Sequence, residues 1–181
     1  GVVSVYAGDG STSAVLDGDY SGAGFLSLRN SAGTERISLD GEGYSSGGSL
    51  NMRSAAGGVA ATIDSNNGTG GGGYLSINSP AGTTRAAELY DETSGGRLNL
   101  YQKNGTQTAL IDGDANNNNG GGQLSLYQAN GGIGVSLDAD ATSANGGANI
   151  VFYAGDGSST VRMDADAGDG AGTLTVANDV S

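Results

Sequence analysis

Residues 122–138 read GQLSLYQANGGIGVSLD, and the pattern of this stretch recurs along the whole chain. Leu124 and Leu126 alternate with polar residues, a segment around Gly131 follows, and a second alternation of apolar and small residues ends at Asp138. Apolar residues at every second position indicate a β-strand with one buried face. Glycine supplies the positive φ that turns require. The stretch therefore predicts two short strands separated by a turn.

The same pattern recurs along the entire chain at intervals of 23 to 26 residues. In each repeat, apolar residues stand seven and five positions before one glycine. After that glycine, apolar or small residues stand at the fourth and sixth positions, and Asp stands at the seventh. Only the fourth repeat departs, at Glu88-Leu89, which we interpret as a local slip by one residue. We predict turns at the seven repeat glycines: Gly10, Gly33, Gly57, Gly82, Gly105, Gly131 and Gly157.

The repeats define the domain organisation. Seven of them and a partial eighth at residues 173–176 predict one repetitive shaft over residues 1–181 with no separate globular domain. Length differences concentrate between the Asp of one repeat and the first strand of the next, as in the Asn-rich stretch 115–121. Such Gly, Asn, Asp and Ser residues favour surface loops outside a rigid two-stranded core.

The number of apolar positions decides between fold classes. Each repeat has only four inward positions, about half of what a single-chain β-solenoid needs, and a lone chain cannot bury such a stripe against itself. Three identical chains around an axis can, with their strand edges paired between neighbours. We therefore predict an all-β fibrous repeat, an intertwined homotrimeric triple-stranded β-helix, with a single-chain β-solenoid as the alternative. The predicted structural core comprises Leu26, Leu28, Leu98, Leu100, Ile111, Leu124, Leu126 and Leu137.

The repeat also resembles a known style of protein. The motif Gly-x-Leu-x-Leu-Tyr-x-x-x-Gly at residues 122–131, followed by Leu-Asp-x-Asp at residues 137–140, resembles the shafts of trimeric bacteriophage tail fibres. It is also similar to the triple-stranded β-helix stalks of phage hyaluronidases and to related repeat fibres encoded by bacteria. The resemblance covers the whole chain and implies three parallel chains about one axis in an extracellular, cell-surface or virion setting.

Composition excludes several classes of protein. The chain has 36 Gly but only 1 Pro, which argues against collagen, and its lack of Cys and His removes disulfide frameworks and nucleophile–base catalysis. A net charge of −12 repels nucleic acid and anionic lipid. There is no apolar run long enough for membrane insertion. We expect no cofactor, no nucleic-acid partner and no enzymatic activity.

Paired carboxylates follow the second strand of most repeats. The weak metal candidates are Asp17, Asp19, Asp112, Asp114, Asp138, Asp140, Asp164 and Asp166, and Asp40/Glu42 share their phase. Two carboxylates per repeat fall short of the six to eight oxygens that Ca²⁺ takes, so we expect turns in which Asp bonds backbone amides. Five near-identical pairs also lack the two different environments that glycosidase carboxyls require.

The predicted function is mechanical. We expect a stiff, acidic extracellular shaft of a fibre or filament, tail-fibre-like, whose partner is itself, as a homotrimer that could polymerise end to end. The alternative is an adhesin-like β-solenoid that binds surface glycan or Ca²⁺. Its glycan site would be the recurring tyrosines on the face opposite the Leu pair, and its Ca²⁺ sites the Asp loops. The tyrosines are Tyr6, Tyr101, Tyr127 and Tyr153.

Overall fold

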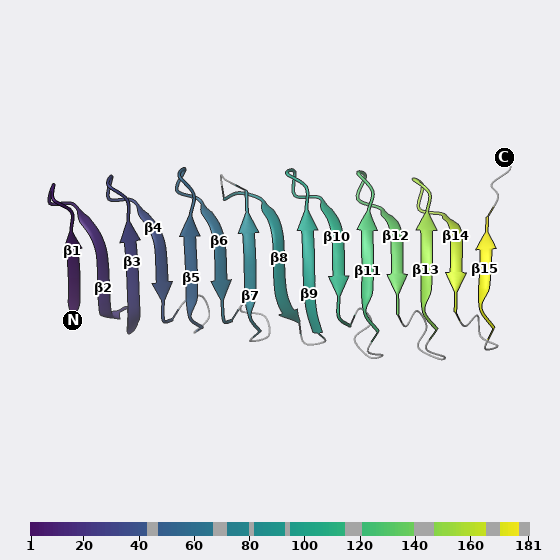
Figure 1. The fold of residues 1–181 in the computed structure, drawn as a ribbon, viewed down its shortest axis with the longest axis horizontal. Coiled ribbons are helices and arrows are strands. Elements are labelled where there is room, and N and C mark those ends of the chain that lie inside the picture. Colours follow the sequence, from purple (N-terminus) through teal and green to yellow (C-terminus); the bar gives the residue numbers. More distant parts are fainter. Residues whose placement is uncertain are drawn as a thin grey trace. The chain divides into compact units, whose positions relative to one another are not determined.

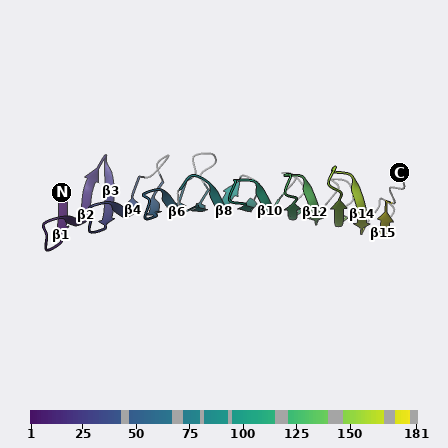
Figure 2. The same cartoon turned by 90° about the horizontal axis from the view of Figure 1, so that it is seen from above.

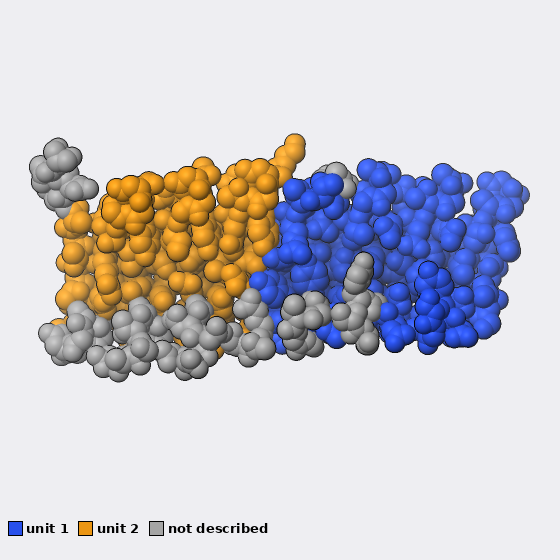
Figure 3. All heavy atoms as spheres, turned by 180° about the vertical axis from the view of Figure 1, so that it is seen from behind, with its two compact units in different colours: residues 1–93 blue, residues 94–181 orange. Residues whose placement is uncertain are grey.

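The computed structural model describes residues 1–42, 47–66, 72–79, 82–92, 95–114, 121–139, 147–165 and 171–177. In these residues the chain forms fifteen β-strands laid out in chain order (Figure 1). It divides into two compact units, residues 1–93 and 94–181, which Figure 3 colours separately. The all-β class predicted from the repeat is confirmed.

Each unit is an antiparallel meander in which every strand pairs with the strands before and after it. Residues 1–93 hold β1 (Val2–Tyr6), β2 (Thr12–Tyr20), β3 (Ala23–Arg29), β4 (Glu35–Asp40), β5 (Ser49–Arg53), β6 (Val59–Asp64), β7 (Tyr74–Asn78) and β8 (Arg85–Glu92). Residues 94–181 hold β9 (Gly95–Tyr101), β10 (Gln107–Asp112), β11 (Gln123–Tyr127), β12 (Ile133–Asp138), β13 (Asn149–Tyr153), β14 (Ser159–Asp164) and β15 (Thr173–Val176).

The repeat glycine sits in the tight hairpin that joins the two strands of a repeat. In the β9–β10 hairpin the amide of Gly105 donates to the carbonyl of Gln102 (2.9 Å), and the amide of Gln102 donates to the carbonyl of Thr106 (2.8 Å). Gly105 has a φ of 85°, and all seven repeat glycines share this left-handed conformation. A tight turn closed by a left-handed residue and followed by a bulge is a standard hairpin connection.

We expect Gly105→Ala to lower the free energy of unfolding by about 1 to 2 kcal/mol, because a β-carbon is strained at positive φ. An added Cβ at Gly105 meets no atom within 4 Å, so conformation alone is tested. Gly96→Ala is the matched control, since its Cβ also meets no atom within 4 Å and its φ lies outside the left-handed region. Urea unfolding measures both variants, and equal losses would contradict the assigned turn.

The fourth hairpin explains the break in the sequence pattern. Its closing bond joins the amide of Ser79 to the carbonyl of Thr84, one residue further along than in the other hairpins. The extra residue shifts β8 so that Leu89 pairs with Leu75 and Glu88 pairs with Ser76. The predicted slip by one residue is confirmed, and the apolar register continues through it.

The strand pairing differs from what the sequence led us to expect. Both edges of β2 to β7 and of β10 to β14 are hydrogen-bonded within the chain, so these edges are not open for pairing between chains. The described strands also do not coil into a solenoid, because consecutive strands return as antiparallel hairpins. Viewed from above, the strands of each unit form a single layer, and no second layer of described residues covers them (Figure 2).

Candidate functional site

One face of each unit consists of two unbroken rows of apolar side chains that cross every strand. In residues 1–93 the first row is Val3, Leu16, Leu26, Leu39, Leu50, Ile63, Leu75 and Leu89. The second row is Val5, Ala14, Leu28, Ile37, Met52, Ala61, Ile77 and Ala87. We call this surface the apolar face. Direct cross-strand neighbours lie close enough for their side chains to pack.

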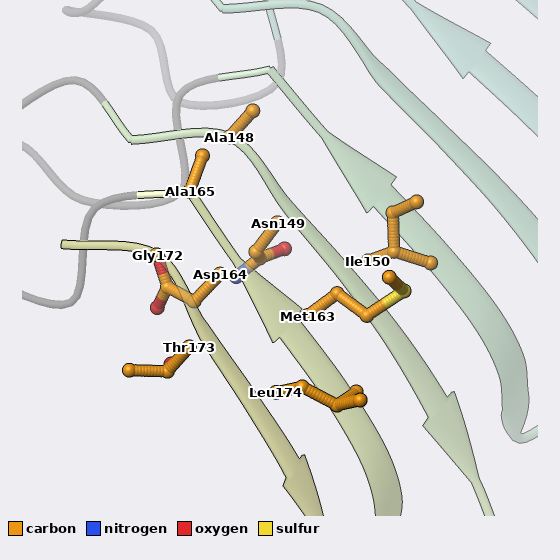
Figure 4. Close-up of a pocket in the computed structure, with 9 residues that line it drawn as sticks. All are labelled: Ala148, Asn149, Ile150, Met163, Asp164, Ala165, Gly172, Thr173 and Leu174. Carbon is orange, nitrogen blue, oxygen red and sulfur yellow. The ribbon is translucent and has the colours of Figure 1, made fainter.

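The same two rows recur in residues 94–181. One is Leu98, Ile111, Leu124, Leu137, Ile150, Met163 and Leu174, and the other is Leu100, Ala109, Leu126, Val135, Phe152, Val161 and Val176. Figure 4 shows Ile150, Met163 and Leu174 side by side on three adjacent strands, where they line a shallow open depression. A second depression lies over Ile111, Leu124 and Leu137 and is likewise open.

The apolar face is uncovered in the isolated chain. Ile63 is 49 % exposed and Ile111 is 51 % exposed, and many members of both rows resemble them. Two rows about 7 Å apart over seven or eight strands about 4.8 Å apart give roughly 500 Å² of apolar surface in each unit. Contiguous apolar patches of this size on a soluble protein mark interaction sites.

The eight residues predicted to form the core all lie on this face. Leu26, Leu98 and Leu124 are half-buried, whereas Leu28, Leu100, Ile111, Leu126 and Leu137 are exposed. The alternation placed them on one face correctly, but a single layer has nothing to bury them against. The buried apolar residues of the described chain are instead Leu110 and Val151, on the opposite face.

The opposite face is mostly polar, and many of its side chains hydrogen-bond to one another, although the buried Ser125 hydroxyl has no hydrogen-bond partner among the described residues. Its central row contains short polar side chains that are almost fully buried, such as Ser27 and Ser125. The Ser27 hydroxyl donates to Glu35 (2.9 Å), and Arg53 Nε lies 3.3 Å from the same carboxylate. Long polar side chains thus cover the small central side chain of Ser27.

In unit 2 the side-chain amide of Gln107 donates to Asn99 (2.7 Å) on the same polar face. In unit 1 the buried carboxylate of Glu88 pairs with Arg85 (2.7 Å). Sequence reasoning missed these networks. The signal for them was the recurrent Ser or Asn between the two apolar residues of each first strand, which indicates a row too crowded for large side chains.

In three of the acidic pairs the first carboxylate bonds the backbone close to it in the chain. The carboxylates of Asp17, Asp40 and Asp112 accept hydrogen bonds from the backbone amides two residues later, at 3.0, 3.0 and 3.1 Å. Asp164 lies 2.7 Å from the guanidinium of Arg162. Asp138 ends β12, and Asp19 and Asp114 supply two of the donating amides, Asp19 from within β2. Asp140 and Asp166 fall outside the described residues. Within the described chain, no three carboxylates gather into a metal-binding group.

Two hairpin turns contain carboxylates of unusual acidity. The Ser158 hydroxyl donates to Asp156 (2.7 Å) and the Ser158 amide donates to the same oxygen (2.9 Å). These bonds, chiefly that from the hydroxyl, hold the pKa of Asp156 below its ordinary value. Ser11 does the same for the pKa of Asp9.

We expect Ser158→Ala to raise the pKa of Asp156 toward its ordinary value and to leave that of Asp9 unchanged. Because the folded-state pKa is lowered, the turn contributes stability above the ordinary pKa and loses it as the pH falls through the folded pKa. Carboxyl NMR titration measures both groups in one sample, with Asp9 as the internal control. An unchanged Asp156 midpoint would contradict the role of the hydroxyl.

The tyrosines expected to form a ladder lie on alternate strands. Tyr101, Tyr127 and Tyr153 end β9, β11 and β13, and their cross-strand neighbours are Gln107, Ile133 and Ser159. Two strand spacings, about 9.6 Å, therefore separate successive tyrosines. The most exposed of the four, Tyr6, lies on β1 in the other unit. The arrangement is a spaced row rather than a continuous stacking surface.

Comparison with known proteins finds no family model and no curated sequence that matches the chain. In the part of the chain that the structure describes, no helix is long and apolar enough to cross a membrane. The two apolar rows, and the repeat that produces them, are the features of the chain that bear on its function.

Proposed function

We propose that the chain is a structural shaft: a segment of a homotrimeric fibre in which three copies pack by their apolar faces around one axis. The observation that carries this proposal is the pair of unbroken apolar rows, exposed on one face of a single-layered sheet. Stable β-proteins bury such a face against a second layer. Because both units present the same kind of face and the opposite face is polar, other copies of the chain are the partner that fits it.

The periodicity of the face supports a copy of the chain over an unrelated partner. Its side chains repeat with the strand spacing along each unit, and another sheet of the same spacing matches that period along its whole length. Neighbouring strands of each unit are antiparallel, and in Figure 1 their axes stay nearly aligned, with little of the usual twist. Sheets this flat are usually stabilised by stacking or by side-chain ladders.

The width of the sheet suits a triangular arrangement. A strand of five residues is about 17 Å long. Three sheets of that width, placed as the sides of an equilateral triangle, each lie about 5 Å from the axis. This is half of the ~10 Å that separates packed sheets, so side chains from the two apolar rows fill the space between them. The trimer we propose is held together by its apolar faces, in keeping with the hydrogen bonding of both edges of β2 to β7 and of β10 to β14 within the chain.

The function of such an object is to span distance. Similar repeats stacked along one axis would produce a stiff rod, and the charge of −12 per chain would keep it soluble and discourage aggregation. The resemblance to phage and bacterial repeat fibres supports an extracellular, cell-surface or virion setting, and a mechanical role without enzymatic activity. The shaft would hold whatever the fibre carries at a distance from the surface that bears it.

Light scattering coupled to size exclusion tests the proposal. At micromolar concentration we expect a mass three times the 17.6 kDa of one chain, with β-type circular dichroism. Binding of an apolar dye should be low, because the apolar faces are mutually covered. A folded monomer with intact β-type circular dichroism and strong dye binding would overturn the proposal, and a stable dimer would overturn the triangular arrangement.

A further inference from the structure

The charges of residues 1–93 are sorted between the two ends of the strands. The hairpins that join β1 to β2, β3 to β4, β5 to β6 and β7 to β8 lie along one edge, which we call the hairpin edge (the upper edge in Figure 1). The opposite edge, where β2, β4, β6 and β8 end, we call the strand-end edge.

The hairpin edge holds all four arginines of this unit and two of its carboxylates. The arginines are Arg29, Arg36, Arg53 and Arg85, and the carboxylates are Asp9 and Glu35. Among the described side chains, the strand-end edge holds six carboxylates and no cation. These are Asp17, Asp19, Asp40, Glu42, Asp64 and Asp91. Glu88, in the middle of β8, pairs with Arg85 (2.7 Å), so the hairpin edge has a small positive charge, whereas the strand-end edge is strongly negative.

Both edges present charges to solvent at matching levels along the sheet. Arg29 ends β3 and is exposed, and Glu42, two residues after the end of β4, is exposed at the other end of the same strand pair. Arg85 begins β8, with its side chain 57 % exposed, and the exposed Asp91 lies near the end of that strand. The two ends of a strand pair thus have opposite charge at the same level.

Symmetry decides which edges meet in an assembly. Rotation about an axis that runs across the strands brings the hairpin edge of one copy beside the strand-end edge of the next. Rotation about an axis parallel to the strands brings like edges together, so that the acidic edges face each other across about 10 Å. That distance is comparable to the Debye length of about 8 Å at physiological salt, so repulsion between the acidic edges is only partly screened and disfavours this second arrangement.

We propose that, in the assembly of this chain, the arginine-bearing hairpin edge of one copy contacts the acidic strand-end edge of the next copy at the same level. The contact pairs Arg29 of one copy with Glu42 of its neighbour. This proposal rests on the proposed function. In it, the charged edges of the neighbouring copies select the orientation in which the copies pack. The apolar faces supply the cohesion, and the charged edges exclude the arrangement in which acid meets acid.

The same pair cannot interact within one chain. Arg29 and Glu42 lie at opposite ends of β4, whose six residues span about 20 Å, more than twice the Debye length. Any energetic coupling between them in the assembled protein must therefore come from contact between copies. This makes a double-mutant cycle a direct test.

The experiment measures assembly of Arg29→Glu, Glu42→Arg and the double variant by sedimentation velocity over a range of concentrations. We expect each single reversal to raise the dissociation midpoint by roughly tenfold, since it replaces three attractive contacts per trimer with repulsive ones. We expect the double variant to return close to the parent midpoint. The cost of placing a second carboxylate opposite Glu35, the cross-strand neighbour of Arg29, cancels in the cycle.

Net charge alone predicts a different pattern. Arg29→Glu changes the charge from −12 to −14 and Glu42→Arg from −12 to −10, so non-specific repulsion would weaken assembly in the first variant and strengthen it in the second. The control cycle combines Arg29→Glu with Asp91→Arg, whose carboxylate lies on the same edge but at the level of β8. We expect no coupling in that cycle.

The outcomes separate this inference from the proposed function. Assembly of the parent protein without coupling between Arg29 and Glu42, or with equal coupling in the control cycle, would overturn the edge contact and leave the shaft intact. A parent protein that stays monomeric would overturn the shaft itself. Coupling confined to the Arg29 and Glu42 cycle would establish the contact.

Discussion

Replacing Leu126 by Asp should abolish assembly while leaving the isolated chain folded. Leu126 lies on the apolar face, 44 % exposed in the single chain, between Ala109 and Val135 on the neighbouring strands. In the proposed trimer it is buried, and burying an unpaired carboxylate costs several kcal/mol per chain. The dissociation midpoint should rise more than about a hundredfold, since each factor of ten is only 1.4 kcal/mol.

The matched control for Leu126→Asp is Ala129→Asp. Ala129 is exposed in the turn of the same β11–β12 hairpin, so both variants add one carboxylate and carry a charge of −13, one below the parent −12. We expect Ala129→Asp to assemble like the parent protein. Light scattering and circular dichroism distinguish the cases. Assembly of Leu126→Asp with parent affinity would show that the apolar face is not the contact surface, whatever the oligomeric state.

Much of this fold could be predicted from the sequence because the same pattern of alternating apolar residues and a turn glycine recurs in every repeat. Alternation placed the apolar pairs on one face, and the repeat glycines stood where the hairpins need a left-handed residue, as Gly105 and Gly131 do. Even the irregular fourth repeat was interpretable, since Glu88 on an otherwise apolar phase is explained by a shift of one residue.

What the sequence did not reveal is the partner of each strand edge. Alternation specifies which face a residue occupies, but the same pattern serves a strand that pairs within its chain and one that pairs with another chain. Burial has the same limit, because Leu28 and Ile111 alternate in the same way whether the layer that covers them comes from their own chain or from another copy; in the single chain both are exposed. The polar networks around Glu35 and Glu88 depend on cross-strand register, which single-strand patterns do not specify.

An insertion within a strand and one within a hairpin should have opposite outcomes. One Ser inserted between Asn99 and Leu100 puts the two halves of β9 out of phase, so that either Leu98 or Leu100 leaves the apolar face. Each copy then loses a buried leucine and gains a polar residue inside the assembly. Together these cost several kcal/mol per chain. We expect the trimer to be lost or its unfolding midpoint to fall sharply.

The control insertion copies a solution already present in the chain. The fourth hairpin closes one residue later than the others, at Thr84, yet β8 keeps Leu89 opposite Leu75. One Ser inserted directly after Gly105 lengthens the β9–β10 hairpin in the same way, and loop lengthening costs only fractions of a kcal/mol, on the order of 0.6 per doubling. Its unfolding midpoint in urea should lie close to that of the parent. An equal fall in the unfolding midpoint for both insertions would mean that the length of the hairpin matters as much as the phase of the strand. The proposal that the apolar face holds the fibre together would then be wrong.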